Sequence, residues 1–231
     1  MTFSIAGHCP RTGMFGIAIT TSSICVASRC AWARAGAGAV LTQNFTDPRL
    51  GIRGLDLLAG GMSAADTIRE LVRENQHAAY RQLAAIDRRG KTSFFSGEKT
   101  LGTHAGAEGK ECVAVGNLLA DPEIPREMVW AFEEDPDRHL AHRLLRALER
   151  GLEAGGEISP VNSAGLMVVH DQPWPLVDLR VDWQDNPVGL LRELWKRYEP
   201  QIKTFLFWAL SPEEAPPFHS PSLPSPLEGE G

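Results

Sequence analysis

The sequence predicts a layered α+β sandwich, in which helices pack on two antiparallel sheets. Strand-like segments follow one another through short turns, as antiparallel pairing requires. Helices with one apolar face occur in two pairs between the groups of strands, so each pair needs a sheet face to cover. No interdomain linker interrupts the first 210 residues of the 231-residue chain. We therefore expect a single domain over residues 1–210.

The chain opens with a predicted β-hairpin. Apolar and small polar residues alternate over Thr2–His8, the segment Cys9–Gly13 has the composition of a turn, and alternation resumes over Phe15–Ile19. Another β run covers Gly38–Gln43. The remaining predicted strands are Arg81–Asp87, Lys91–Ser96, Glu111–Gly116, Ser163–His170 and Leu176–Asp182.

The predicted helices carry recognisable start and stop signals. A helix over Leu50–Ala59 ends at a pair of glycines, and the next begins at Ser63 with Asp66 three residues on, as in a capping box. The later helices are predicted at Ile124–Glu133, Asp137–Ala154 and Pro187–Tyr198. Residues 211–231 are rich in proline and acidic residues and lack apolar periodicity, which predicts a disordered tail.

Composition excludes several functional classes. Hydrophobic residues make up 43% of the chain and charged residues 23%, which is ordinary for a globular protein. No apolar run approaches the ~20 residues of a membrane span, so we expect a cytoplasmic protein without a membrane partner. The net charge is −6, but four acidic residues lie beyond Lys203, and the rest of the chain carries −2. With no basic run, nucleic acid is not an expected partner.

We expect neither a cofactor nor a metal. The Gly36–Ala39 segment lacks the third glycine of a dinucleotide loop and the lysine of a P-loop. The four cysteines form no C-x-x-C pair, and His139 and His142 lie off the leucine stripe of their helix, which is typical of a solvated face.

Thr2 is the most informative residue for chemistry. Initiator methionine is commonly removed before a residue as small as threonine, and the chain would then begin with Thr2 at the head of a strand. Its α-amine, with a reference pKa of about 7.7 to 8.0, could accept the proton of its own hydroxyl, so one residue would supply nucleophile and base. The alternative is that Met-Thr is simply a common way for a protein to begin.

Several blocks of the sequence, in the right order, resemble the bacterial and archaeal family called domain of unknown function 1028. The blocks are Thr2–Ala6, Pro10–Gly13, Gly16–Ile19, Trp32–Val40, Gly51–Leu58, Val115–Leu119, Ser163–Val169 and Asp178–Asp182. That family is grouped with the N-terminal-nucleophile hydrolases. The resemblance thus implies a four-layer αββα sandwich with the nucleophile at the start of a strand.

The resemblance also raises the question of a supporting cation. Proteasome-like relatives place a lysine near the nucleophile, whereas the first lysine here is Lys91. A steering role would therefore fall to Arg29, Arg34 or a later residue.

Other polar residues at strand ends are candidates for the site. Asn117, just after a strand, could donate to an oxyanion or orient the Thr2 amine, the alternative being a turn asparagine in a left-handed conformation. Ser22 and Ser23 end the second hairpin strand, where their hydroxyls could bond an N-terminal amine or merely satisfy a turn.

Two more residues are candidates for substrate binding. Gln43, with Asn44, could bind a substrate amide, or the pair could cap the following helix. Arg53 could grip a substrate carboxylate, or form an exposed helix pair with Asp56 three residues on.

These observations predict an amide-bond hydrolase with Thr2 as nucleophile, acting on a small amide or peptide-like substrate. Its oligomeric state is left open, and a homo-oligomer is allowed. The alternative is a binding or structural protein with the same sandwich and no catalytic set. A third class, metal-dependent hydrolysis through His8 and Cys9, is more distant because the spacing gives no reason to expect a metal.

Overall fold

The computed structural model describes residues 2–214 and divides into two compact units between Lys196 and Arg197. The first unit contains both sheets. Of the tail expected at 211–231, the part from residue 215 on lies outside the described residues.

The larger sheet has six antiparallel strands in the order β10-β9-β2-β1-β8-β7. The hairpin of β1 (Thr2–Cys9) and β2 (Met14–Thr21) lies at its centre, as the alternation predicted. β1 is flanked on its other side by β8, so its backbone is paired along both edges. The other strands are β7 (Ala105–Gly109), β8 (Cys112–Asn117), β9 (Ser163–Val169) and β10 (Val177–Val181).

The smaller sheet has four antiparallel strands in the order β3-β4-β5-β6. Its strands are β3 (Ala31–Arg34), β4 (Gly38–Asn44), β5 (Arg81–Asp87) and β6 (Thr92–Ser96). The two sheets pack face to face over a buried apolar core that includes Ile17, Leu41, Ile86 and Val115.

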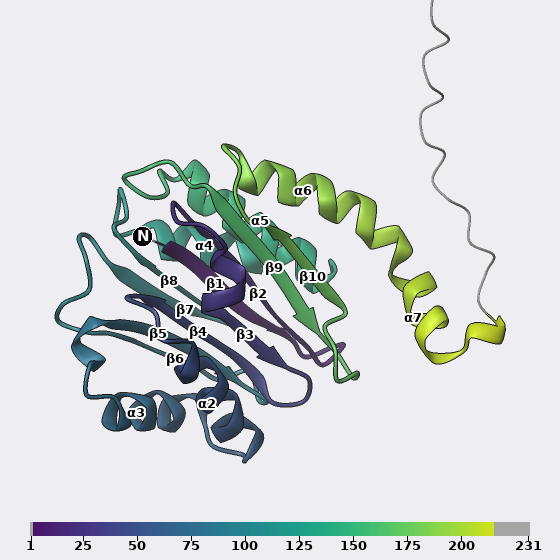
Figure 1. Ribbon diagram of the computed structural model, residues 1–231, viewed down its shortest axis with the longest axis horizontal. Coiled ribbons are helices and arrows are strands. Elements are labelled where there is room, and N and C mark those ends of the chain that lie inside the picture. The colour runs from purple at the N-terminus through teal and green to yellow at the C-terminus, as the bar shows by residue number, and fades with distance from the viewer. Residues whose placement is uncertain (1, 215–231) are drawn as a thin grey trace, which may run out of the picture. The chain divides into compact units, whose positions relative to one another are not determined.

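Helices cover the outer face of each sheet (Figure 1). α2 (Pro48–Ala59) and α3 (Ala64–Glu74) pack on the smaller sheet, and α4 (Ile124–Glu133) and α5 (Leu140–Glu153) pack on the larger one. The predicted α+β fold is therefore confirmed as a four-layer αββα sandwich of two antiparallel sheets.

Local signals explain where the helices begin. Ser63 accepts a hydrogen bond from the backbone N–H of Asp66, as the capping box predicted. Asp47 caps α2 by accepting from the N–H of Arg49. α6 (Pro187–Tyr198) has the predicted bounds, and its Arg192 forms an ion pair with Glu149 of α5 at 2.6 Å.

Four elements were not predicted. α1 (Val26–Cys30) and β3 are too short to show periodicity, and β7 has the sequence AGAEG, without a large apolar residue. The fourth is α7 (Ile202–Leu210), in the second unit. In addition, α5 begins at Leu140, three residues after the predicted start, because His139 is its N-cap. The short 3₁₀ helices are Ala78–Tyr80, Glu199–Gln201 and Pro212–Glu214.

Within the second unit, the Phe205 ring of α7 contacts the rings of Tyr198 and Trp208. Across residues 2–214, none of the helices combines the length and the apolar character that a membrane crossing demands.

Candidate active site

Thr2 lies at the start of the central strand β1, at the end marked N in Figure 1. It is 5% exposed and stands opposite Asn117 of β8 in the antiparallel register. β2 and β8 flank β1, so the residue that sequence reasoning selected as nucleophile sits at the start of a rigid element. Ser22, Ser23 and Gln43 lie at the same end of the sandwich.

A chain of hydroxyl groups leads away from Thr2. Its Oγ1 donates to Oγ1 of Thr21 at 3.3 Å, and Thr21 Oγ1 lies 3.5 Å from Oγ of Ser23. Arg29 Nη2 donates to the same Ser23 oxygen at 2.9 Å. Of the two early arginines considered, Arg29 is thus joined to the Thr2 network. Arg34 instead forms an ion pair with Asp56 at 2.9 Å.

Gln43 is fully buried between the sheets, where it contacts the backbone of the candidate nucleophile. Its Oε1 accepts from Ser4 Oγ at 2.6 Å, and its Nε2 lies 3.4 Å from the carbonyl oxygen of Thr2. Nε2 also donates to Oε1 of Gln82 at 2.8 Å. The alternative role in capping the next helix is wrong for Gln43 and Asn44, because Asp47 is the cap.

Asn117 is the last residue of β8 and is fully buried. The alternative of a left-handed turn asparagine is wrong, because the left-handed residue is its neighbour Leu118, with φ of 52°. Asn117 Nδ2 donates to Gln82 Oε1 at 3.0 Å. Its Oδ1, by contrast, is buried and accepts no hydrogen bond from residues 2–214. A buried acceptor without a donor is costly, which makes this oxygen a candidate for holding a ligand or an amine.

Glu157 is a residue of this region that sequence reasoning missed. Its segment pairs with the residues that follow Asn117: the N–H of Ala120 donates to Gly156, and the N–H of Ile158 donates to Leu118. Glu157 is 7% exposed, and neither of its carboxylate oxygens has a well-formed hydrogen bond to the described part of the chain.

The electrostatic environment of Glu157 ties it to the start of the chain. Burial raises its pKa to about 7, and the positive chain terminus and the nearby Ser22 hydroxyl and backbone partly oppose that rise. Little in the sequence signals this residue, since Glu157 follows a Gly-Gly pair and belongs to no motif. Gln82 could have been found as the one amide of β5, directly before its apolar run Leu83–Ile86.

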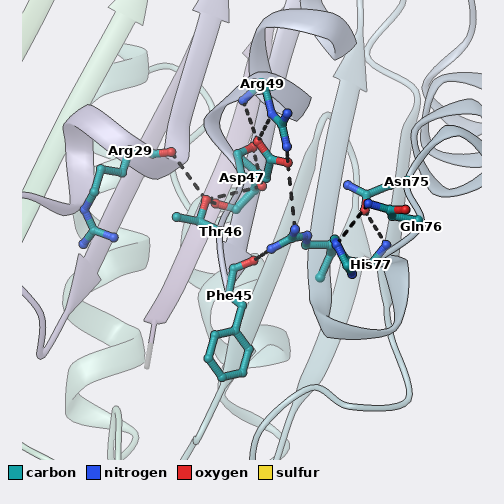
Figure 2. Close-up of polar contacts among 10 residues, drawn as sticks. Arg29, Phe45, Thr46, Asp47, Arg49, Asn75, Gln76 and His77 are labelled. Atoms are coloured by element: carbon teal, nitrogen blue, oxygen red, sulfur yellow. Dashed lines mark hydrogen bonds and ion pairs between the residues drawn. The ribbon is translucent and has the colours of Figure 1, made fainter.

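Arg53 is not brought to Thr2. It lies on α2 and lines a separate cleft of about 360 Å³ with Glu74, to which it is bonded at 3.0 and 3.1 Å. The expected alternative, a pair with Asp56, is wrong, because Asp56 pairs with Arg34. Figure 2 shows the polar wall of this cleft, where Asp47 binds Arg49 and the Asn75 side chain accepts from the His77 N–H.

The metal hypothesis gains no support from side-chain placement. Residues 2–214 contain no group of three or more His, Cys, Asp or Glu side chains placed to hold an ion. His8 Nδ1 instead lies 2.6 Å from Glu111 Oε2, and its ring stacks on Phe15. All four cysteines are free thiols.

A solved structure resembles this chain in both fold and sequence. The protein SPO2555 from Silicibacter pomeroyi, described as DUF1028, is 32% identical, with a TM-score of 0.79 over 85% of this chain and 88% of that one. Among curated proteins, no relative matches.

Structures of Anbu, the ancestral β-subunit, match with much lower scores. The protein from Yersinia bercovieri is 14% identical with a TM-score of 0.35, over 88% of this chain and 96% of that one. The protein from Hyphomicrobium sp. strain MC1 is 10% identical with a TM-score of 0.40, over 94% of this chain and 100% of that one. At such scores these likenesses carry no argument about function. The family of unknown function DUF1028 matches residues 2–191, and this chain belongs to that family.

Proposed function

We propose that the protein is an amide-bond hydrolase of the N-terminal-nucleophile type, with Thr2 as nucleophile once Met1 has been removed. The observation that supports it is a pair of buried acceptors near Thr2, Asn117 Oδ1 and the Glu157 carboxylate, that lack well-formed hydrogen bonds from residues 2–214. The α-ammonium group of a chain beginning at Thr2 brings three donors and a positive charge. It would satisfy both acceptors, which apolar packing does not.

In the proposed reaction, Thr2 Oγ1 attacks the carbonyl carbon of an amide while its α-amine takes the hydroxyl proton. The tetrahedral intermediate collapses when the amine gives that proton to the leaving nitrogen, and the acyl group remains on Thr2 as an ester. Water, deprotonated by the same amine, then attacks the ester and frees the enzyme. Backbone N–H groups supply the oxyanion contacts.

The other residues support the amine and the hydroxyl. Asn117 acts on the amine, since its Nδ2 already donates to Gln82. Glu157 has a pKa of about 7, within reach of that of a terminal amine, so the pair can exchange a proton at neutral pH. Ser22 and Ser23 hold the rim of the site, where a small amide or peptide-like substrate would enter. Gln43 fixes the Thr2 carbonyl and, being fully buried, acts as a positioning residue.

The first experiment is intact-mass analysis before and after treatment with an amide-mimicking β-lactone. We expect a chain that lacks Met1 and gains one probe mass, with the adduct mapped to Thr2. Thr2→Ala should fold normally and take no probe, and Thr2→Ser should restore labelling. Thr2 is only 5% exposed in the chain that includes Met1, so labelling should require the removal of Met1.

A matched pair of threonines tests the hydroxyl chain. Thr21→Val removes the partner of the Thr2 hydroxyl and should slow labelling. Thr20→Val removes an equally buried hydroxyl that donates to Ser163 instead, and should leave the labelling rate unchanged. If Met1 is retained in the native protein, or if Thr2→Ala still takes the probe, the non-catalytic binding or structural protein becomes the better description.

A further inference from the structure

A cavity of about 460 Å³ lies at the far end of β1 from Thr2, beside the turn that joins β1 to β2. Its lining includes Cys9, Arg11, Lys110, Glu133 and Arg143. None of these residues belongs to the Thr2 network, so a ligand bound in this cavity would be independent of the proposed hydrolase activity.

Arg143 of α5 is the unusual member of this lining. It is only 6% exposed, its Nε donates to the carbonyl oxygen of Phe132 at 3.1 Å, and its guanidinium lies 3.9 Å from the centre of the Phe132 ring. Yet it forms no ion pair with the described residues, and its two terminal nitrogens, Nη1 and Nη2, donate to none of them. Burial also lowers its pKa. Because its guanidinium has no anionic partner among the described residues, an anion that enters the cavity would stabilise the positive charge of Arg143.

The acidic residues around the cavity form no ion pair with Arg143, although Asp135 has a minor favourable charge interaction with it. Glu111 pairs with His8 at 2.6 Å, and Asp137 pairs with Arg11 at 3.5 Å. Glu133 accepts from the backbone N–H of Lys110 at 2.6 Å and is exposed. These carboxylates also disfavour a ligand with several negative charges, since like charges repel. A ligand with a single negative charge fits best.

Cys9 places a second reactive group at the same cavity. Cys9 is 3% exposed and lines the space together with Arg143. Burial by itself would raise the pKa of Cys9, but hydrogen bonds with Thr12 and Arg11 outweigh that effect and lower it. The thiol is therefore more readily ionised than an ordinary buried cysteine, such as Cys112, whose pKa is raised to about 12.

We propose that this cavity is a binding site for a small monocarboxylate, which the terminal nitrogens of Arg143 grip end-on, with the Cys9 thiol beside the bound molecule. A planar carboxylate matches the paired donors of a guanidinium better than a neutral amide does. Binding would also give the Arg143 guanidinium the anionic partner that it lacks among the described residues.

The test compares two alkylating probes that differ only in charge. Iodoacetate carries a carboxylate and iodoacetamide a neutral amide; in both, the thiolate sulfur bonds to the CH₂ carbon as iodide leaves. Cys25, which is half-buried and lines a different part of the surface, is the internal reference. Peptide mass spectrometry follows both alkylation rates at each cysteine. The rate with iodoacetate divided by the rate with iodoacetamide should be about tenfold or more higher at Cys9 than at Cys25, as expected for a hydrogen bond to a charged group.

Arg143→Gln should reduce the Cys9 ratio to that of Cys25, and excess propionate, but not propionamide, should protect Cys9. Equal ratios at the two cysteines, or a ratio unchanged by the substitution, would overturn the proposal.

Calorimetry provides a readout that requires neither Cys9 reactivity nor a variant. Propionate should bind the parent protein measurably and propionamide should not, and equal heats for the two would also refute the site. Arg143→Lys keeps the positive charge but loses the paired donors of the guanidinium, so it should bind propionate more weakly than the parent. This variant replaces Arg143→Gln if the glutamine variant does not fold.

Discussion

Replacing Glu157 by glutamine should remove a pH-dependent loss of stability. Burial raises the pKa of this carboxyl from 4.5 to about 7 in the folded chain. Between those values the folded protein keeps a proton that the unfolded chain has released. Folded molecules then bind more protons, so the free energy of unfolding falls as pH rises through this window and levels off above it.

The size of the effect follows from the two pKa values. One pKa unit is worth about 1.4 kcal/mol, so the difference corresponds to ~3 kcal/mol. Glu157 is 7% exposed, and solvent screening therefore reduces this figure little. Glutamine keeps the shape of the side chain but cannot ionise. The stability of Glu157→Gln relative to the parent should rise by ~3 kcal/mol from about pH 4 to about pH 8, or roughly 6 to 12 °C in melting temperature.

Urea unfolding of the two proteins at both pH values measures this difference, with intact mass confirming that both have the same N-terminus. Glu153→Gln is the control. Glu153 is half exposed, and its hydrogen bond with Arg146 lowers its pKa, so its contribution to stability is present above the unfolded pKa and lost in acid. The stability of Glu153→Gln relative to the parent should therefore fall as the pH rises, which is opposite to the change expected for Glu157→Gln. A difference between Glu157→Gln and the parent that does not change with pH would refute the predicted linkage.

Three further predictions concern the fold. Gln82→Leu leaves Gln43, Asn117 and the Gly116 carbonyl short of partners, and chemical denaturation should show a loss of ~1 to 3 kcal/mol for each buried group left unsatisfied. Gly38→Ala would place a Cβ 2.1 Å from the Ile86 carbonyl oxygen, whereas at Gly36 a Cβ meets no atom within 4 Å. Both glycines have positive φ, so Gly36→Ala should cost ~1 to 2 kcal/mol and Gly38→Ala clearly more; equal losses would contradict the steric explanation. Truncation after Leu210 should leave the melting temperature unchanged, because the sequence beyond it lacks apolar periodicity; a drop of several degrees would show that the segment contributes.

The sequence was sufficient where a local signal was strong. The β1 and β2 hairpin was predicted from alternation and a turn, and α3 from the side chains of Ser63 and Asp66 that cap it. β7 was not predicted because a strand of small residues has no apolar pattern. Its backbone pairing with β8 stabilises it in place of side-chain burial. Such a strand can be found only from the sheet that accepts it.

The candidate site was predictable only in part, for a similar reason. Thr2 has a chemical signature in one residue, and Asn117 follows directly from a strand end. Glu157 has neither, since it is 155 positions from Thr2 and comes near it only through the pairing of its segment with Leu118–Ala120. Arg53 shows the converse case: its guanidinium pairs with Glu74 of the next helix in a cleft separate from Thr2, and its role in substrate binding stays a prediction.

The amides of Gln43 and Gln82 have a mechanical consequence for the sandwich. Apolar side chains between two sheets pack without strict direction, so on their own they resist sliding only weakly. Hydrogen bonds lose strength steeply once distance or angle departs from the ideal. Gln43 and Gln82 of the smaller sheet bond to Thr2, Ser4, Gly116 and Asn117 of the larger one. A slide of one sheet over the other would break these bonds together. The two sheets therefore resist relative movement most strongly where the first residues of β1 lie.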